Sequence, residues 1–248
     1  MSEKSSFPGL KVLLIQAREE HDMRLQEHTC FVERTRLAPD QILTYNLPLD
    51  AVRSRAEEGF DAVFIGGAGA YSAWEDYSWM PHGLDTVRRI CDSGVPVFGS
   101  CWGHQMIARA LGGTVIHDPS CAEMGCLPVH LTESGQTDPL LGSFPSSFLA
   151  NMGHHDRVVE LPEGAVELAR SDTQPYESFR MRDRPIYGTQ FHSELDAARE
   201  RERLLRYQQF YADELPDAHT LQAVIDGLAE TTDVDHLLYD FLALYFRS

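Results

Sequence analysis

Nearly continuous apolar runs alternate with polar, helix-favouring segments through the first part of the chain. Residues 10–16 (LKVLLIQ) form one such run, which is typical of a strand buried on both faces. The alternation continues to Phe98, and a further helix is expected over 106–111. This βαβ rhythm predicts a parallel sheet with helices on both faces. The predicted strands are 10–16, 41–47, 61–65 and 95–98, and the predicted helices between them are 19–36 and 85–92.

The pattern changes after residue 112. Residues 113–178 hold short alternating segments separated by glycine, proline and aspartate, which predict antiparallel additions and loops. A predicted strand at 186–191 and a long predicted helix at 196–212 follow. The expected fold class is therefore α/β, with a mostly parallel central sheet, flanking helices and antiparallel additions.

The end of the chain has a helical periodicity of its own. Apolar residues recur at i, i+3, i+4 and i+7 in two stretches, which begin at Leu221 and Val234. Thr232 and Asp235 resemble a capping box before the second stretch. We therefore expect a domain over 1–212 and a C-terminal helical extension, 213–248, packed on it. Packing on the core is the first interpretation of the apolar stripes, and an interface role is the alternative.

Composition and charge narrow the class of protein. The 248-residue chain is 43% hydrophobic and 24% charged, as ordinary globular proteins are, and its net charge is −17. Because phosphate binding needs a basic surface, this acidity argues against nucleic acid or an anionic membrane as the main partner. Five irregularly spaced cysteines argue against a disulfide framework and favour a reducing cytoplasm. No apolar run reaches the roughly 18 residues that would span a bilayer.

The sequence GSCWG at 99–103 carries the strongest chemical signal. It has the form G-x-C-x-G, the thiol counterpart of the G-x-S-x-G nucleophile elbow. A nucleophile on a sharp strand-to-helix turn has a strained backbone, and side chains two residues before and after it would collide. The N-terminus of the following helix favours the thiolate. Taken alone, the pattern leaves two alternatives open for Cys101: a presented nucleophile or a crowded packing corner.

Two further motifs favour the nucleophile. The sequence QFHSE ends a predicted strand, so His192 and Glu194 project to the same face and the carboxylate can orient the imidazole. Thiol, base and orienting acid then form the set that a catalytic triad requires. The glycine loop GGAG follows the third predicted strand. A phosphate loop is one interpretation, but an oxyanion hole made by the N–H groups of Gly67 and Trp102 is the better one.

Together, GGAG, GSCWGHQ and QFHSE resemble the class I (triad-type) glutamine amidotransferase domain. That family pairs a G-G-P-G-like loop with a G-x-C-x-G-x-Q elbow and a Q-F-H-P-E strand end. The resemblance runs from about residue 10 to 209, and MGHHDRVVELPEG looks like the S-H-G-D-x-V region of GMP synthase amidotransferase domains. It implies the family's flavodoxin-like architecture. Ala68 and Ser193 replace two of the family's prolines, and neither change removes a reacting group.

The resemblance implies a role for each matching residue. Cys101 would be the nucleophile, His192 the base and Glu194 the acid that orients the base. Gly67 and Trp102 would supply the oxyanion donors. No metal or organic cofactor would be needed for this half-reaction.

The resemblance also outlines a substrate pocket. His155 stands where GMP synthases carry glycine, which leaves free glutamine and a larger γ-glutamyl compound open as substrates. His154 and His155 are adjacent and diverge in direction, which argues against a metal pair. The aromatic-rich loop 70–80 is a candidate wall of the pocket or, alternatively, a packed surface loop. The residues that would line the pocket are Gly69, Gln105, Gly153, His154, His155 and Asp156.

The implied reaction is hydrolysis of the γ-carboxamide of glutamine through a cysteine γ-glutamyl thioester, with release of ammonia and glutamate. No ATP-binding motif is visible, and the residues after 212 are too few for a synthetase domain. Ammonia would therefore pass to a separate synthetase subunit, or the protein would act alone. The alternatives are a γ-glutamyl peptidase or hydrolase acting on γ-glutamyl peptides or amines, and a catalytically idle family member that binds a partner.

Overall fold

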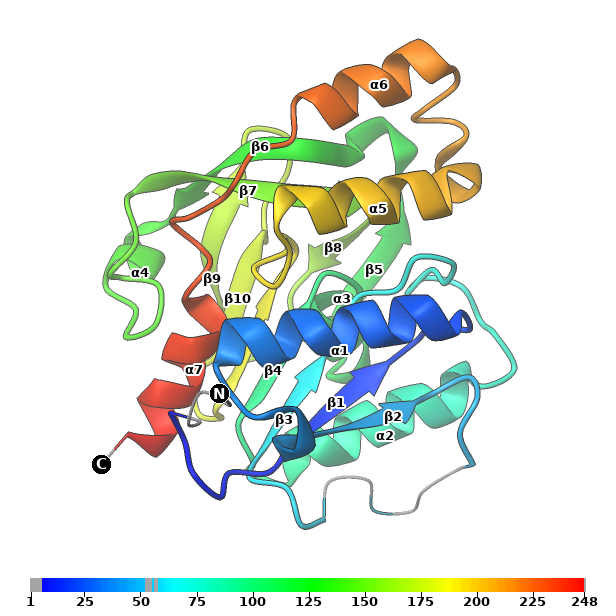
Figure 1. Cartoon of the computed structure of the whole chain (residues 1–248). Coiled ribbons are helices and arrows are strands. Elements are labelled where there is room, and N and C mark those ends of the chain that lie inside the picture. The colour runs from blue at the N-terminus through cyan, green and yellow to red at the C-terminus, as the bar shows by residue number, and fades with distance from the viewer. Residues whose placement is uncertain (1–5, 52–54, 56–57, 248) are drawn as a thin grey trace.

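The computed structural model describes residues 6–51, 55 and 58–247, and its centre is a nine-stranded sheet (Figure 1). The strand order is β2-β1-β3-β4-β11-β10-β9-β6-β7, and β5 pairs with β8 in a separate two-stranded sheet. The strands are β1 (Val12–Gln16), β2 (Ile42–Asn46), β3 (Ala62–Ile65), β4 (Val97–Ser100), β5 (Thr114–His117), β6 (Glu123–Leu131), β7 (Ser147–His154), β8 (Asp156–Glu160), β9 (Ala165–Ser171), β10 (Ser178–Met181) and β11 (Ile186–Thr189).

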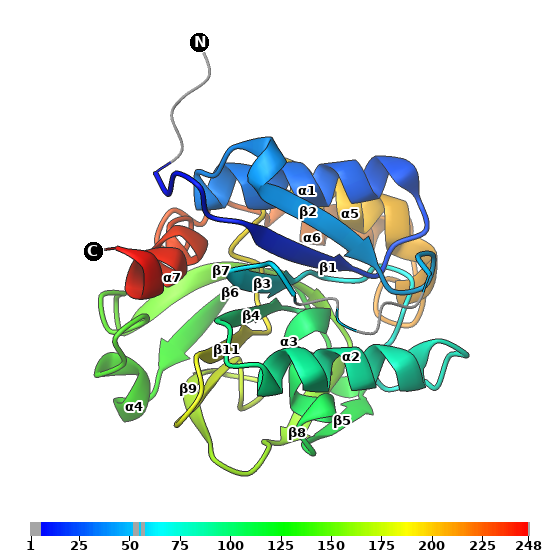
Figure 2. The same ribbon diagram turned by 90° about the horizontal axis from the view of Figure 1, so that it is seen from below.

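Helices cover both faces of the sheet (Figure 2), with α1 and α5 on one face and α2 and α3 on the other. The α-helices are α1 (His21–Thr35), α2 (Met80–Asp92), α3 (Trp102–Ala110), α4 (Glu133–Gln136), α5 (Ala197–Tyr207), α6 (Ala218–Asp226) and α7 (Leu237–Phe246). Short 3₁₀ turns occupy η1 (Pro39–Gln41), η2 (Pro119–Cys121) and η3 (Gln208–Tyr211). None of the helices in the described ranges combines the length and apolar character that crossing a bilayer requires.

The parallel half of the sheet is the βαβ unit that the apolar runs predict. Strand β1 pairs in parallel with β2 and β3, and β4 joins β3 to β11. All five residues of β1 are buried, and alternate residues enter different cores. Leu14 packs in the core beneath α1, whereas Leu13 and Ile15 pack in the core beneath α2 and α3. The apolar run is continuous because both faces of the strand are covered.

The second half of the sheet is antiparallel, as the short alternating segments predict. Strand β11 pairs with β10 in antiparallel fashion, and β9, β6 and β7 continue the sheet in the same way. The predicted α/β fold class is therefore confirmed. Helix α2 begins earlier than the predicted residue 85, because Pro81 fits the first turn, where no N–H donor is needed.

The C-terminal helices pack on different parts of the molecule. Helix α6 buries Leu221 and Ile225 in a small apolar cluster with residues of α1, α5 and η3. Helix α7 is part of the core beneath α1, where it contributes four fully buried residues (Leu237, Leu238, Phe241 and Leu242). The predicted division at residue 212 stays a prediction.

The predicted capping box at Thr232 and Asp235 is wrong. Helix α7 begins at Leu237, its N-cap is His236, and no side chain in the described ranges caps it. The carboxylate of Asp235 instead forms an ion pair with Arg34 of α1, at 2.9 Å. A tertiary contact has thus taken the side chain that local sequence assigned to a cap.

The packing of α7 gives the first prediction. Phe241 is fully buried, and its ring centroid lies 5.4 Å from that of Phe98 and 5.7 Å from that of Phe64. Phe241→Ala should lower the free energy of unfolding by about 3–5 kcal/mol, since it removes an aromatic side chain and leaves a cavity. Leu244→Ala, on the exposed side of the same helix, should change it by about 0.5 kcal/mol or less. Urea denaturation measures both, and similar values for the two would show that α7 is peripheral.

Candidate active site

Cys101 lies on a strained turn between β4 and α3. Its backbone angles are φ 51° and ψ −105°, and left-handed φ values are costly for a non-glycine residue. A Cβ at Gly99 would lie 2.5 Å from the carbonyl carbon of Gly103, and a Cβ at Gly103 would lie 2.1 Å from the carbonyl oxygen of Ile65. The glycines two residues before and after Cys101 are therefore required by close packing, as the elbow pattern predicts.

His192 and Glu194 lie side by side after the end of β11. Nδ1 of His192 is 2.7 Å from Oε1 of Glu194, and both side chains are buried. The main-chain N–H of His192 donates to the carbonyl of Asn151, which fixes the backbone at this point. Since Nδ1 faces the carboxylate, Nε2 is the nitrogen left for chemistry.

Two residues that the motifs do not single out hold Glu194. The hydroxyl of Ser100 donates to Oε2 of Glu194 at 2.8 Å, and Nη1 of Arg203 donates to Oε1 at 3.3 Å. Arg203 belongs to α5 and is itself 6% exposed. Ser100 sits inside the elbow motif, so its position next to Cys101 is a usable signal. An arginine on an amphipathic helix gives none.

Electrostatics couple the three groups Cys101, His192 and Glu194. Burial favours a neutral imidazole, yet the pKa of His192 is raised well above its usual value by the charge of Glu194 and by charge and hydrogen bonding with Cys101. Burial likewise opposes ionisation of Glu194, but the pKa of its carboxyl is lowered by His192, Arg203 and Ser100. The site therefore favours an imidazolium next to a carboxylate.

These shifts give a prediction about His192. In the Cys101→Ala variant the pKa of His192 should fall below its value in the unchanged protein, because one of its two negative neighbours is lost. It should stay above its usual value, since Glu194 remains. NMR titration of the imidazole nitrogens measures this pKa, with the exposed His219 as the internal reference. An unchanged pKa of His192 would show that the thiol does not interact with the imidazole.

The glycine loop after β3 lies against the same histidine. A Cβ at Gly67 would be 3.2 Å from Cε1 of His192, so the loop backbone approaches the imidazole closely. At Gly69 a Cβ would lie 2.2 Å from the ring of Tyr207, so this position is restricted to glycine. The N–H of Gly66 donates to the carbonyl of Ile15, which ties the loop to the end of β1.

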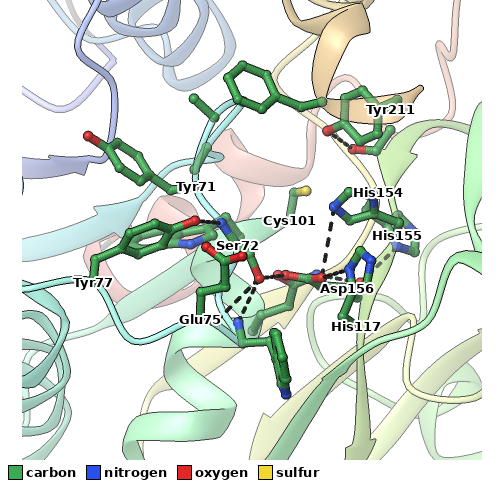
Figure 3. A pocket seen from close by; sticks show the side chains of 18 residues that line it. Tyr71, Ser72, Glu75, Tyr77, Cys101, His117, His154, His155, Asp156 and Tyr211 are labelled. Atoms are coloured by element: carbon green, nitrogen blue, oxygen red, sulfur yellow. Dashed lines mark hydrogen bonds and ion pairs between the residues drawn. The ribbon is translucent and has the colours of Figure 1, made fainter. Parts of the chain in front are cut away.

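A pocket of about 480 Å³ opens beside Cys101 (Figure 3). Tyr71, Trp74 and Tyr77 from the aromatic loop line it, whereas Trp79 is not among the lining residues and has its ring centroid 6.1 Å from that of Trp102. The other lining residues are Ala68, Gly69, Ala70, Ser72, Glu75, Cys101, Trp102, Gln105, His117, Gly153, His154, His155, Asp156, Phe210 and Tyr211. All six residues predicted for the substrate pocket thus line this cavity, and Gly67 does not.

Gln105 and Asp156 are held within a buried hydrogen-bond network. Nε2 of Gln105 donates to the carbonyl of Asp156 at 2.7 Å and to Oε1 of Gln190 at 3.0 Å. The amide of Gln190 in turn lies 3.6 Å from Sγ of Cys101. Gln190 belongs to the QFHSE sequence, but strand alternation alone does not reveal that its side chain reaches the thiol.

His154 and His155 diverge, as adjacent residues of a strand end should. His154 faces the interior, where its Nε2 lies 3.3 Å from Oε2 of Glu123, and Nε2 of Gln174 bridges the carboxylates of Glu123 and Glu177. Burial and the charge of Glu123 raise the pKa of Glu177 well above its usual value. The pKa of Glu123 is lowered to about 2, since His154 outweighs the effect of burial. One carboxylate of this pair is therefore ionised and the other protonated.

Two clusters of the described residues bring possible metal ligands within 4.8 Å of one another. Glu123, His154 and Glu177 form a fully buried cluster, already bridged by Gln174. The cluster of His117, His155 and Asp156 lines the pocket instead. His117 belongs to β5, which no motif connects to the site.

Comparison with known protein families places most of the chain in one of them. The family described as "Glutamine amidotransferase class-I" matches residues 31–211. A GMP synthase (glutamine-hydrolyzing) of Thermosipho africanus is 33% identical over 150 residues, and one of Streptomyces avermitilis is 34% identical over 143 residues. These matches cover 60% and 58% of this chain but 27% of each relative. The chain therefore corresponds to about a quarter of the length of these curated relatives.

Solved structures share the fold across nearly the whole chain. A glutamine amidotransferase from Thermotoga maritima superposes with a TM-score of 0.75 at 22% identity, covering 96% of this chain and 99% of that one. The protein of a putative GMP synthase subunit from Thermoplasma acidophilum superposes with a TM-score of 0.61 at 23% identity, covering 84% of this chain and 98% of that one. At these identities the likeness concerns the fold.

Proposed function

The chain belongs to the class I glutamine amidotransferase family, and we propose that it hydrolyses glutamine to glutamate and ammonia through a γ-glutamyl thioester on Cys101. One observation carries the proposal: Cys101 stands on a strained elbow at the pocket and interacts with His192, which Glu194 holds at 2.7 Å. A buried thiol of purely structural use needs neither the strain nor the oriented imidazole.

The proposed acylation step uses the ion pair of Cys101 and His192. The Cys101 thiolate attacks the γ-carboxamide carbon and forms the S–C bond, while the carbonyl electrons move to oxygen. When the oxyanion collapses, the C–N bond breaks, and Nε2 of His192 gives its proton to the departing nitrogen. Ammonia leaves, and the γ-glutamyl thioester remains. The carboxylate of Glu194 stabilises the imidazolium before the transfer and fixes the tautomer afterwards.

We propose that the N–H groups of Gly67 and Trp102 hold the oxyanion. Trp102 is the first residue of α3, so its N–H has no partner within the helix and lies at the positive end of the helix dipole. Gly67 lies against His192, on the loop that follows β3. Two such donors aimed at a developing charge are the largest single contribution in many acyl-transfer enzymes.

A second, small cavity supports the hydrolytic step. It measures about 20 Å³ and is lined by residues that include Cys101, His192 and Glu200. This volume is enough for one water molecule, and Oε2 of Glu200 is a buried acceptor without another partner among the described residues. We propose that a water here gives its proton to His192 and attacks the thioester carbon. The S–C bond then breaks, glutamate leaves and the thiolate is restored.

The size of the main pocket favours a second candidate function. At about 480 Å³ it lies in the range that holds drug-sized ligands, whereas free glutamine is smaller. A γ-glutamyl peptide or amine would place its γ-glutamyl group at Cys101 and its leaving amine toward the aromatic loop 70–80. In that case the same thioester forms and an amine leaves in place of ammonia.

Product analysis separates these functions. The purified chain is supplied with glutamine or with γ-glutamyl peptides, and ammonia, glutamate and free amine are measured. Ammonia from glutamine supports the first function, and cleavage of the peptides alone supports the second. If neither occurs, labelling with an electrophilic glutamine analogue decides. Mass spectrometry should find the label on Cys101 if the site is competent, and no label would favour the catalytically idle alternative.

We propose that a synthetase carried by a separate subunit uses the ammonia. The support is the likeness to the Thermoplasma acidophilum structure, which is described as that of a putative GMP synthase subunit. Adding the synthetase with its substrates should raise the rate of glutamine hydrolysis by this chain. An unchanged rate and free release of ammonia would instead support independent action.

A further inference from the structure

Three side chains with metal-ligating atoms meet at one edge of the pocket (Figure 3). His117 ends β5 and Asp156 begins β8, and these two residues pair across the small antiparallel sheet. Nδ1 of His117 is 2.9 Å from Oδ1 of Asp156. His155 directly precedes Asp156, and its Nε2 is 3.9 Å from the same oxygen. Strand pairing therefore fixes the group.

The spacing of these atoms suits a small tetrahedral cation. Ligand atoms around a tetrahedral Zn²⁺, with bonds of about 2.0–2.2 Å, lie about 3.4 Å apart. The separations of 2.9 and 3.9 Å bracket this value, so side-chain shifts of about half an ångström would complete the set. Two imidazoles and one carboxylate are donors that Zn²⁺ prefers, and they leave a fourth position open.

The supporting contacts are those that metal sites use. Oε1 of Glu214 lies 2.9 Å from Nδ1 of His155, so this carboxylate accepts the Nδ1 proton and leaves Nε2 as the free lone pair. The hydroxyl of Ser72 donates to Oδ2 of Asp156, which leaves Oδ1 for the cation. Glu214 follows η3. The adjacent pair His154 and His155 predicts no metal site by itself, because the third ligand comes from β5.

We propose that His117, His155 and Asp156 bind Zn²⁺ at the edge of the substrate pocket, and that bound Zn²⁺ excludes the substrate. The second clause rests on the proposed function, in which His155 and Asp156 line the substrate site. An ion held there occupies both side chains and part of the cavity that opens on Cys101. Zinc is then a reversible inhibitor that raises the KM for glutamine and leaves kcat unchanged.

Direct binding tests the site without any substrate. The full chain is titrated with Zn²⁺ against a chromogenic chelator, and folding of each variant is checked by circular dichroism. The unchanged protein should bind one equivalent, and His117→Ala should weaken binding by about 100-fold. Glu214→Gln should weaken it by about tenfold, because only the supporting carboxylate changes. His130→Ala is the matched control, since His130 of β6 also pairs with an aspartate, 3.2 Å away.

Binding at the catalytic thiol is the rival explanation. Co²⁺ bound by thiolate gives an intense charge-transfer band that nitrogen and oxygen ligands do not give. The proposal expects a Co²⁺ spectrum without this band and unchanged affinity in Cys101→Ser. Loss of binding in Cys101→Ser, or equal binding in His117→Ala and the unchanged protein, overturns the site. Inhibition by Zn²⁺ that does not depend on glutamine concentration overturns the exclusion, and absence of any glutamine hydrolysis overturns only the proposed function.

Discussion

Cys101→Ala should lower the rate of glutamine hydrolysis by about 10⁴-fold or more, because no other group can form the thioester. Alanine and cysteine tolerate the backbone at φ 51° equally poorly, so the turn should keep its geometry and its stability. Initial rates of ammonia release with saturating glutamine measure the effect. The loss should appear in kcat, since the pocket that binds glutamine is unchanged.

Cys121→Ala provides the matched control. Cys121 lies in η2, is partly exposed and does not line the pocket, so its removal should leave the rate within about twofold. A Cys101→Ala protein that keeps a tenth or more of the activity would show that Cys101 is a packed corner residue. Hydrolysis would then have to proceed by direct attack of water.

Local patterns predict the fold wherever burial leaves a period in the sequence. Both faces of β1 are buried, so residues 10–16 read as one apolar run, and β3 and β4 follow the same rule. The end of the chain shows the limit. The periodicity of α7 is visible in the sequence, but its first residue is not, because Asp235 pairs with Arg34 rather than capping the helix.

The candidate site is predictable to the extent that its chemistry is local in sequence. Cys101 with its flanking glycines, and His192 with Glu194, each lie within a few residues of one another. His117 and Arg203 reach the site only through the pairing of β5 with β8 and the packing of α5. Such contacts join residues far apart in the chain, so a single sequence carries no period or spacing that reveals them.

Glu194→Gln is the second change with a large expected effect. The amide has the size of the carboxylate, but it carries no charge to stabilise the imidazolium of His192. It can also donate to Nδ1, which favours the tautomer whose Nε2 carries the proton and cannot accept another. The rate of glutamine hydrolysis should fall by about 10³–10⁴-fold, as it does when a triad carboxylate becomes an amide. Steady-state kinetics should show the loss in kcat rather than in KM.

A pH profile distinguishes orientation of His192 from a purely structural role of Glu194. Since Glu194 raises the pKa of His192, the amide should shift the basic limb of the profile of kcat/KM to lower pH. The lowered pKa of Glu194 stabilises the folded state above the carboxyl's unfolded pKa of about 4.3, and this contribution is lost as pH falls through the folded value. The variant should therefore melt at a lower temperature at pH 7, and the difference should shrink in acid. Glu163→Gln, at an exposed site, should change neither profile nor melting. A Glu194→Gln protein that melts lower but keeps its rate and its pH profile would show that the carboxylate only holds Arg203 and Ser100 in place.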